Sequence, residues 1–343
     1  MSDADGFSPS EPEPTPLGDD AILPFELERA GIRGRLVRLD RTLETILTQH
    51  RYPDAVSALV SEAALLTAMI GQAIKLRWRF SLQIRGSGPV KLIATDYFAP
   101  EAEGAPARMR AYASFERGDV ASSRATGLAL LGQGVFGVTI DQGPDMRPYQ
   151  GITPLTGERL ADCAEVYFAQ SEQLATRFRS LAAKAQTPGA AAHWRGGGLM
   201  LQQLPEALSG AQPDAPSGAE GLMTADDVAA MGAREEDWSR ANLLADTVEE
   251  HELIGPHVSP ERLLTRLFHE ESPRVYPVQA VRFGCTCSAE RVEAALAQYS
   301  DRDIAHMTTP EGTVTADCQF CSAHYTFDPA MLGFEAAARR KKG

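Results

Sequence analysis

The sequence contains no continuous apolar run of the ~18 residues that a transmembrane helix requires. Its best candidate, residues 63–76, is interrupted by a threonine, a glutamine and a lysine. The N-terminus also lacks the basic and apolar regions of a secretory signal, because residues 1–20 carry six acids and four prolines. We therefore expect a soluble, cytoplasmic protein.

Basic residues are too few for a polyanion-binding protein. Lysine and arginine total 33 against 46 acidic residues, which gives a net charge of -13. Such a chain is repelled on average by nucleic acid and by anionic membranes, so we expect neither as a partner. The 343 residues, 43% of them hydrophobic, are enough for a substantial core and for roughly two domains.

Cysteine is also scarce, with five in the whole chain, which excludes a disulfide-rich scaffold. Four of the five nevertheless fall between positions 285 and 321. In a reducing compartment, such clustering favours metal binding. The fifth, Cys163, lies in a helical pattern and is interpreted as a small buried side chain.

The order of patterns along the chain predicts an α+β fold with an N-terminal core of antiparallel sheets around a buried helix. We divide the chain into a disordered acidic tail (1–20), a core domain (21–205), a flexible or helical linker (206–272), a domain that holds the four clustered cysteines (273–330) and a basic tail (331–343). Expected strands are 32–39, 78–84, 90–94, 109–115 and 135–140, and expected helices are 40–49, 56–74 and 160–183. Gly196-Gly197-Gly198 is interpreted as a flexible turn, after which 199–204 could rejoin the core.

Residues 224–270 are predicted to form an acidic helical connector. Ser259 is its expected N-cap, with an apolar face at Leu263, Leu264, Leu267 and Phe268. Its acids are expected to repel one another and to weaken the helix (Asp226, Asp227, Glu235, Glu236, Asp237, Asp246, Glu249, Glu250). We expect the C-terminal module to cover this connector and hold it in order.

The cysteine cluster consists of Cys285-Thr286-Cys287 and Cys318-Gln319-Phe320-Cys321, with 30 residues between the pairs. Four thiolates in two close pairs suit a tetrahedral zinc site, and His324 could replace one sulfur. The flanking sequence predicts an αββ module too small to fold well without metal. Spacing alone leaves open an architectural zinc site, a redox-active site and chance clustering.

Zinc-bound thiolates stay nucleophilic, so an oxidant such as peroxide could drive each close pair toward a disulfide and expel the metal. The Cys318 and Cys321 pair should oxidise more readily, because an i, i+2 pair such as Cys285 and Cys287 closes only in a strained ring.

With these residues in view, the sequence resembles the redox-regulated 33 kDa chaperonin, or heat-shock protein 33, family. The resemblance runs from about Gly31 to Asp328 and rests on the two cysteine pairs at the family's spacing. It rests also on Leu267-Phe268-His269-Glu270-Glu271, on Tyr167-Phe168 with Ser171-Glu172-Gln173, and on Tyr149-Gln150-Gly151.

The resemblance implies an ATP-independent holdase, not an enzyme, that binds unfolding client proteins under oxidative stress. It implies that Cys285, Cys287, Cys318 and Cys321 bind one zinc in the reduced state. It further implies that oxidation forms the disulfides Cys285–Cys287 and Cys318–Cys321, releases zinc, loosens the connector and produces a homodimer.

Two other classes of function remain as alternatives. A structural zinc ribbon that binds nucleic acid is disfavoured, because residues 285–328 hold seven acids against Arg291 and Arg302. A thiol-disulfide oxidoreductase would use Cys318 and Cys321, but such motifs usually open a helix beside a parallel sheet.

Overall fold

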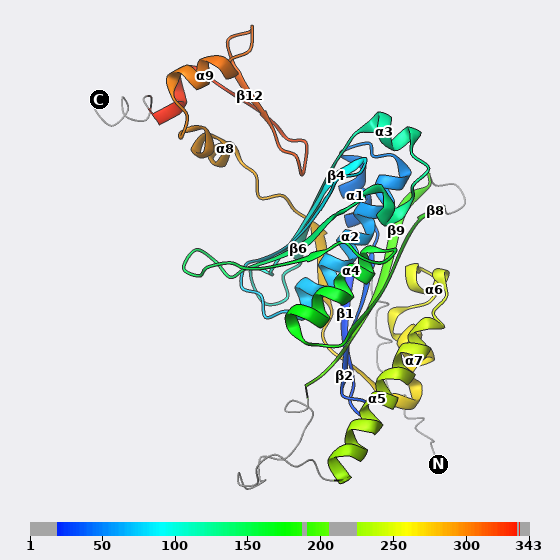
Figure 1. The fold of residues 1–343 in the computed structure, drawn as a ribbon. Coiled ribbons are helices and arrows are strands. Elements are labelled where there is room, and N and C mark those ends of the chain that lie inside the picture. Colours follow the sequence, from blue (N-terminus) through cyan, green and yellow to red (C-terminus); the bar gives the residue numbers. More distant parts are fainter. Residues whose placement is uncertain (1–18, 187–190, 206–224, 335, 337–343) are drawn as a thin grey trace, which may run out of the picture.

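The computed structural model describes residues 19–186, 191–205, 225–334 and 336. The chain has the predicted mixed α+β architecture, in which one large sheet is covered by helices on both faces and a small module follows at the C-terminus (Figure 1). The expected acidic tail lies outside the described residues except for Asp19 and Asp20. Of the basic tail predicted at 331–343, the structure describes 331–334 and 336, and Leu332 there belongs to the buried cluster of the C-terminal module.

The large sheet has eleven strands in the order β7-β6-β3-β4-β5-β11-β1-β2-β9-β8, with β10 beside β1. Among the described strands, β11 alone pairs with both β5 and β1, and its pairing with β5 is the parallel one. This late strand therefore joins the two halves of the sheet. The strands are β1 (Ala21–Leu27), β2 (Ile32–Leu39), β3 (Arg79–Gly86), β4 (Val90–Phe98), β5 (Ala107–Phe115), β6 (Gly134–Asp141), β7 (Tyr149–Pro154), β8 (Thr176–Ala185), β9 (His193–Gln203), β10 (Pro273–Val275) and β11 (Gln279–Phe283).

Helix α2 (Asp54–Ala73) forms the centre of the core, as its apolar pattern predicted. It is long and apolar enough to cross a membrane, but 78% of the relevant window is buried inside the fold, as in a core helix. The shorter helices α1 (Arg41–Thr48) and α4 (Leu160–Tyr167) contact α2, whereas α3 (Arg117–Ser122) follows β5.

The carboxylate of Asp20 caps the N-terminus of α1. Its oxygens accept hydrogen bonds from the backbone N–H groups of Asp40 (2.9 Å), Arg41 (3.0 Å) and Thr42 (2.9 Å). These groups have no partner within the helix, so an acidic residue distant in sequence stabilises the helix start.

The helix predicted over 160–183 is wrong in its second half. Helix α4 ends at Tyr167, a π-helical turn covers Phe168–Glu172, and Gln173 has a positive φ of 53°. The chain then enters β8, where Thr176 and Phe178 are buried and the residues between and after them are not. This alternation has the period of a strand, which we mistook for the continuation of a helix.

The turn predicted at Gly196-Gly197-Gly198 is also wrong, because these glycines form the middle of β9, the strand that also contains the apolar residues predicted to rejoin the core. A Cβ on Gly197 would lie 2.1 Å from the carbonyl oxygen of Leu253, and one on Gly198 would lie 2.9 Å from Val37. The glycines thus allow close packing on both faces of the sheet.

The connector forms α5 (Ala225–Asp246), α6 (Glu250–Ile254) and α7 (Pro260–Phe268), which lie on the face of the sheet opposite α2 (Figure 1). Ser259 caps α7, as predicted, by accepting a hydrogen bond from the backbone N–H of Arg262 (3.3 Å). The predicted apolar face is buried against strand residues of β1, β2 and β9 (Leu23, Phe25, Leu27, Ile32, Leu36, Leu199, Leu201).

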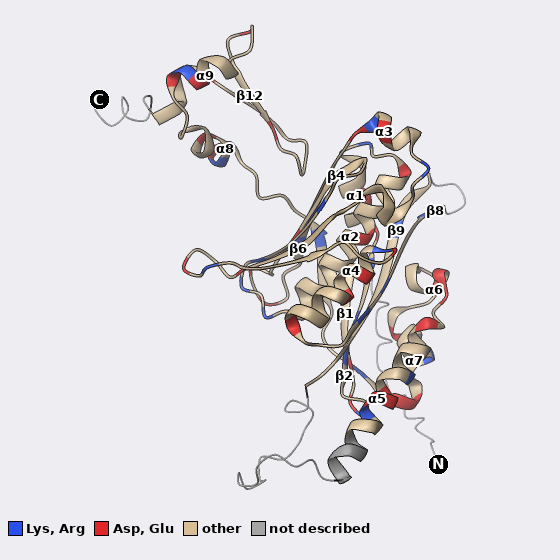
Figure 2. Cartoon of the chain, in the orientation of Figure 1, with Lys and Arg blue, Asp and Glu red and all other residues tan. Residues whose placement is uncertain are grey.

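We expected the acids of the connector to repel one another, but several of them form ion pairs with arginines. Asp246 pairs with Arg179 (2.6 Å) and Arg177 (3.5 Å) of β8, and Asp237 pairs with Arg240 (2.6 Å). The buried Arg38 of β2 donates to the backbone carbonyl of Leu253 (3.1 Å). Figure 2 shows acidic residues on the connector helices and basic residues along the strands. Basic residues of the sheet therefore offset part of the repulsion.

The C-terminal module consists of α8 (Ala289–Leu296), α9 (Asp301–Met307) and the hairpin β12 (Val314–Asp317) and β13 (His324–Phe327). The predicted helix and two strands are confirmed, and Ser288 caps α8 as expected. Helix α9 was missed, although Ser300 and Asp303 form a capping box at its start. Among the described residues, the buried cluster of the module consists of Ile304, Val314 and Leu332, with Leu296 and Phe327 partly buried against it. Such a small core has little apolar burial to stabilise it.

Candidate metal centre

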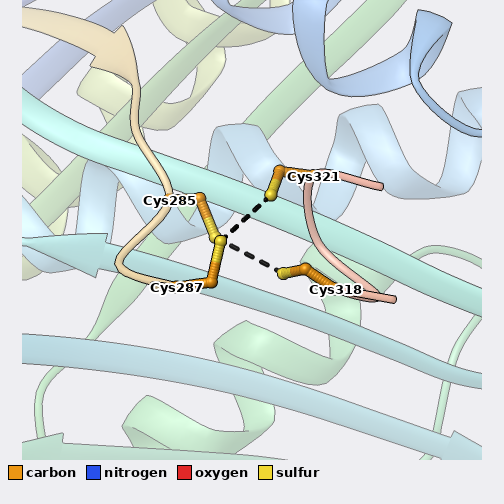
Figure 3. A group of neighbouring side chains, drawn as sticks. All are labelled: Cys285, Cys287, Cys318 and Cys321. Atoms are coloured by element: carbon orange, nitrogen blue, oxygen red, sulfur yellow. Dashed lines mark hydrogen bonds between the residues drawn. The ribbon is translucent and has the colours of Figure 1, made fainter. Parts of the chain in front are cut away.

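The four clustered cysteines converge at one end of the module, as Figure 3 shows. Cys285 and Cys287 lie on the segment between β11 and α8, and Cys318 and Cys321 lie in the turn between β12 and β13. All four sulfur atoms lie within 4.8 Å of one another. Two segments about thirty residues apart in sequence thus form one thiol cluster.

The spacing of the sulfur atoms suits a small tetrahedral cation. The Cys285 and Cys318 sulfurs are 3.6 Å apart, and those of Cys287 and Cys321 are 3.3 Å apart. Zn–S bonds of ~2.3 Å at tetrahedral angles place sulfurs about 3.8 Å apart. All five cysteines of the chain are free thiols in the structure. The cluster could therefore hold a metal ion without a large rearrangement.

The second cysteine pair is held by a tight backbone turn. The N–H of Cys318 donates to the carbonyl of Ala323 (2.9 Å), and the N–H of Ser322 donates to the carbonyl of Cys318 (2.8 Å). Ser322 has a positive φ of 54°, which reverses the chain directly after Cys321. The turn directs both thiols of the pair toward Cys285 and Cys287.

The thiols differ in acidity. Burial opposes ionisation of Cys285, but hydrogen bonds from the Cys287 backbone and from the Arg110 guanidinium outweigh it and lower the pKa to about 7. Burial raises the pKa of Cys318, and burial with the neighbouring thiols raises the pKa of Cys321 strongly. In the metal-free protein, Cys285 is thus a more acidic thiol than Cys318 or Cys321, and a bound cation would favour the thiolate form of all its ligands.

Two side chains that sequence reasoning missed contact the sulfurs. Tyr325 of β13 donates a hydrogen bond to the sulfur of Cys287 (3.1 Å). Arg110 of β5 donates to the sulfur of Cys285 (3.5 Å) and to the hydroxyl of Thr286 (3.2 Å). Arg110 precedes Cys285 by 175 residues, so no local pattern could have indicated this contact.

His324, which we considered as a replacement ligand, does not join the cluster. Its Nδ1 atom lies 2.7 Å from the carboxylate of Asp317, and both side chains are exposed. Within the described part of the chain, the cluster that could hold a metal consists of the four cysteines.

The module does not cover the connector, which corrects our expectation. Its cysteine end contacts β5 and the segment after α1, where Ser322 donates to the carbonyl of Gln49 (3.2 Å) and the rings of Phe320 and Tyr112 meet edge to face. Helices α5 to α7 lie elsewhere on the sheet (Figure 1). The chain links the two regions through β10 and β11, which pair with β1 and β5.

Some of the other residues that carried the resemblance pack in the core, whereas Tyr149, His269 and Glu270 are exposed. Tyr167 and Phe168 are buried, and a Cβ on Gly151 would lie 2.6 Å from the Tyr167 ring. Cys163 is buried as predicted, and its sulfur donates to the carbonyl of Thr156 (3.1 Å). These residues shape the core rather than a reactive site.

The surroundings of Cys318 and Cys321 differ from those of a thiol oxidoreductase. The pair follows β12 of a two-stranded antiparallel hairpin, and the next element is β13 rather than a helix. The pair therefore lacks a helix N-terminus that would lower thiol pKa values.

Comparison with known proteins gives one consistent result. The family model described as Hsp33 protein matches residues 20–328. A 33 kDa chaperonin of Caulobacter vibrioides (strain NA1000 / CB15N) is 37% identical over 316 residues, which cover 91% of this chain and 95% of the relative. A 33 kDa chaperonin of Pseudomonas fluorescens (strain SBW25) is 32% identical over 307 residues, covering 89% and 90%.

A solved structure has the same fold. The crystal structure of the heat shock protein 33 homologue from Thermotoga maritima aligns with a TM-score of 0.70 at 18% identity. The alignment covers 94% of this chain and 100% of that chain.

Proposed function

The chain belongs to the Hsp33 protein family, and from this premise we propose that it is a redox-regulated, ATP-independent chaperone. It holds unfolding client proteins when oxidised and is inactive when reduced. It is not an enzyme, and it acts in the cytoplasm as part of the response to oxidative stress, without a nucleic-acid or membrane partner. The relatives' name of chaperonin supports the client-binding role.

The convergence of four thiols is the observation that carries this proposal. In the reduced protein, Cys285, Cys287, Cys318 and Cys321 hold one zinc ion. Zinc is favoured over harder cations by an all-sulfur ligand set. The metal supplies folding free energy to the module at 273–330, whose own apolar cluster is small.

Oxidation removes this support. A thiolate of Cys318 or Cys321 attacks a peroxide oxygen, forms a sulfenic acid and releases hydroxide. The thiolate of its neighbour attacks the sulfenic sulfur, closes the disulfide Cys318–Cys321 and releases a second hydroxide. The peroxide takes up the two electrons, and Cys285 and Cys287 react likewise. Each disulfide removes two thiolate ligands, so the zinc ion leaves.

The linker at 206–272 connects the module to the core domain at 21–205, and its release exposes the client-binding surface. The face of the sheet beneath α7 contains Leu23, Phe25, Leu199 and Leu201, all buried by the connector. Uncovering this face gives unfolding clients a contiguous apolar surface. We also expect the oxidised protein to form a homodimer, because exposed apolar surface favours association of two chains.

The experiment that tests this function follows zinc, thiols and chaperoning together. Zinc content and free thiols are counted before and after mild peroxide treatment, beside light scattering of an aggregating client without ATP. We expect one zinc and five free thiols before oxidation, and one free thiol, no zinc and suppressed aggregation after it. Oxidised protein that leaves the aggregation unchanged would contradict the chaperone role.

A further inference from the structure

Arg110 contacts both halves of the thiol cluster from the strand on which the module rests. Its Nη1 atom donates to the hydroxyl of Thr286 (3.2 Å) and to the sulfur of Cys285 (3.5 Å). Its guanidinium carbon lies 3.9 Å from the centre of the Phe320 ring. Because Phe320 stands between Cys318 and Cys321, one side chain of β5 links the two cysteine pairs.

The guanidinium is itself held in place by a buried carboxylate. Nε and Nη2 of Arg110 each lie 2.7 Å from the same oxygen of Asp96 on β4, while Ser81 of β3 donates to the other oxygen. The side chains of Arg110 and Asp96 are only 11% and 8% exposed. A buried carboxylate is costly without a partner, so the salt bridge and the Ser81 hydrogen bond favour this arrangement. That arrangement aims the remaining N–H groups of Arg110 at the module.

The turn that carries the second cysteine pair is fixed by further contacts at the same place. The backbone carbonyl oxygen of Phe320 lies 3.3 Å from Nε2 of His50. The Phe320 ring contacts the Tyr112 ring edge to face. Ser322 donates to the carbonyl of Gln49 (3.2 Å). The part of the module docked on the core domain is therefore the thiol cluster and its immediate neighbours.

We propose that Arg110 is a positioning residue of the metal centre, which holds the two cysteine pairs together and anchors the centre to the sheet. This inference rests on the proposed function, in which the cluster binds zinc. A site of four thiolates and one zinc ion carries a net negative charge, which the guanidinium partly balances by a hydrogen bond to sulfur. With the pairs already aligned, metal binding has less ordering entropy to overcome.

The same contacts connect oxidation to release of the module. A disulfide requires a sulfur–sulfur bond of ~2.05 Å, so closing Cys318 onto Cys321 changes the turn that presents Phe320. Arg110 then loses the Phe320 ring, while its contacts with Asp96 and with the Phe98 ring (5.3 Å) remain with the core. Oxidation of one cysteine pair is thereby coupled to undocking of the whole centre.

The inference is tested by measuring zinc affinity of the reduced full-length protein in competition with a chelator. We expect Arg110→Ala to weaken apparent zinc affinity by about 10- to 100-fold, as for other residues that hydrogen-bond metal ligands. Arg79→Ala is the matched control, because Arg79 also has a carboxylate partner, Asp141, and a ring partner, Trp78, but lies on β3. It should bind zinc like the wild type.

Two further variants separate positioning from simple charge neutralisation. Arg110→Lys keeps a positive charge beside Asp96 but loses the planar fork, so it should still weaken zinc binding. If Arg110 merely neutralised Asp96, the lysine variant would bind zinc as tightly as the wild type. Phe320→Ala should weaken zinc binding too. In the double variant Arg110→Ala with Phe320→Ala, the fold-loss of zinc affinity should be smaller than the product of the fold-losses of the two single variants.

Hydrogen exchange of the metal-free reduced protein gives a second, metal-independent measurement. In Arg110→Ala and Arg110→Lys, protection should fall in the turn 318–322, while α2 keeps its protection. Unchanged zinc affinity together with unchanged protection of this turn would overturn the inference. If the wild type binds no zinc, the proposed function fails, and the exchange of this turn still decides whether Arg110 anchors it.

Discussion

Gly197 of β9 lies directly against the backbone carbonyl of Leu253 in α6. A Cβ at position 197 would stand 2.1 Å from that oxygen, far inside van der Waals contact. The connector therefore approaches the sheet backbone to backbone at this point, and only glycine permits it. The docking of α6 on β9 depends on a missing side chain.

Replacing Gly197 with alanine should loosen the connector without oxidation. The added methyl group forces α6 away from the sheet, at a cost of about 1 to 3 kcal/mol for overpacking. We expect faster hydrogen exchange in α6 and α7 and greater binding of an apolar-surface dye in the reduced protein. Gly232→Ala is the control in the connector, because beyond its own helix backbone and chain neighbours its added Cβ would meet nothing within 4 Å. Equal exchange in both variants would contradict this packing argument.

The reduced protein should contain one zinc ion per chain. Replacing any one of Cys285, Cys287, Cys318 or Cys321 with serine should lower the zinc content, because each sulfur belongs to the same cluster. Cys163→Ala should leave it at one, since that thiol is buried elsewhere. Metal analysis of protein prepared without chelator makes the measurement, and a zinc content near zero would refute the site.

In zinc-loaded protein, mild peroxide should form the Cys318–Cys321 disulfide before the Cys285–Cys287 disulfide. All four sulfurs are then thiolates, so ring strain rather than thiol pKa decides the order. Peptide mapping along a time course measures it. Appearance of the Cys285–Cys287 bond first, or of both bonds together, would show that strain is not decisive.

In metal-free reduced protein, a thiol-alkylating reagent should label Cys285 before Cys318 and Cys321. The pKa of Cys285 is lowered to about 7, whereas those of Cys318 and Cys321 are raised. Its thiolate, the reactive form, therefore accumulates as pH rises through about 7, below the ~8.5 of an ordinary thiol. Labelling rates from pH 6 to 9 test this, and a midpoint for Cys285 near 8.5 would contradict it.

Oxidation should raise hydrogen exchange in the module, in β10 and β11, and in α5 to α7, while α2 stays protected. The expected route runs through β11, because this strand joins the module to β5 and β1. Dye binding should rise and client aggregation should fall at the same time, and reduction with zinc should reverse all three. If hydrogen exchange rises in α7 but not in β11, oxidation of the module loosens the connector without involving β11.

Local patterns in the sequence were sufficient for much of the fold. Three features depend on neighbours within a few residues: the helix around Val60, the two paired strands that flank Ser87, and the N-cap at Ser259. Each cysteine pair was recognisable for the same reason, because the spacing within a pair limits where its two sulfurs can lie, whereas the fold brings the two pairs together. Periodicity failed at β8, because the alternation is confined to Thr176 and Phe178 and the small residues that follow, such as Ala182 and Ala183, do not continue it.

The tertiary structure alone decided what the glycines, the arginines and the module do. Gly196-Gly197-Gly198 has the composition of a turn, yet packing against Leu65, Leu253 and Val37 makes it a strand. Arg110 and Cys285 meet only because β11 places the end of the chain beside β5. Contacts between residues so far apart depend on strand order and close approach of the backbone. Short-range propensity contains no information about either.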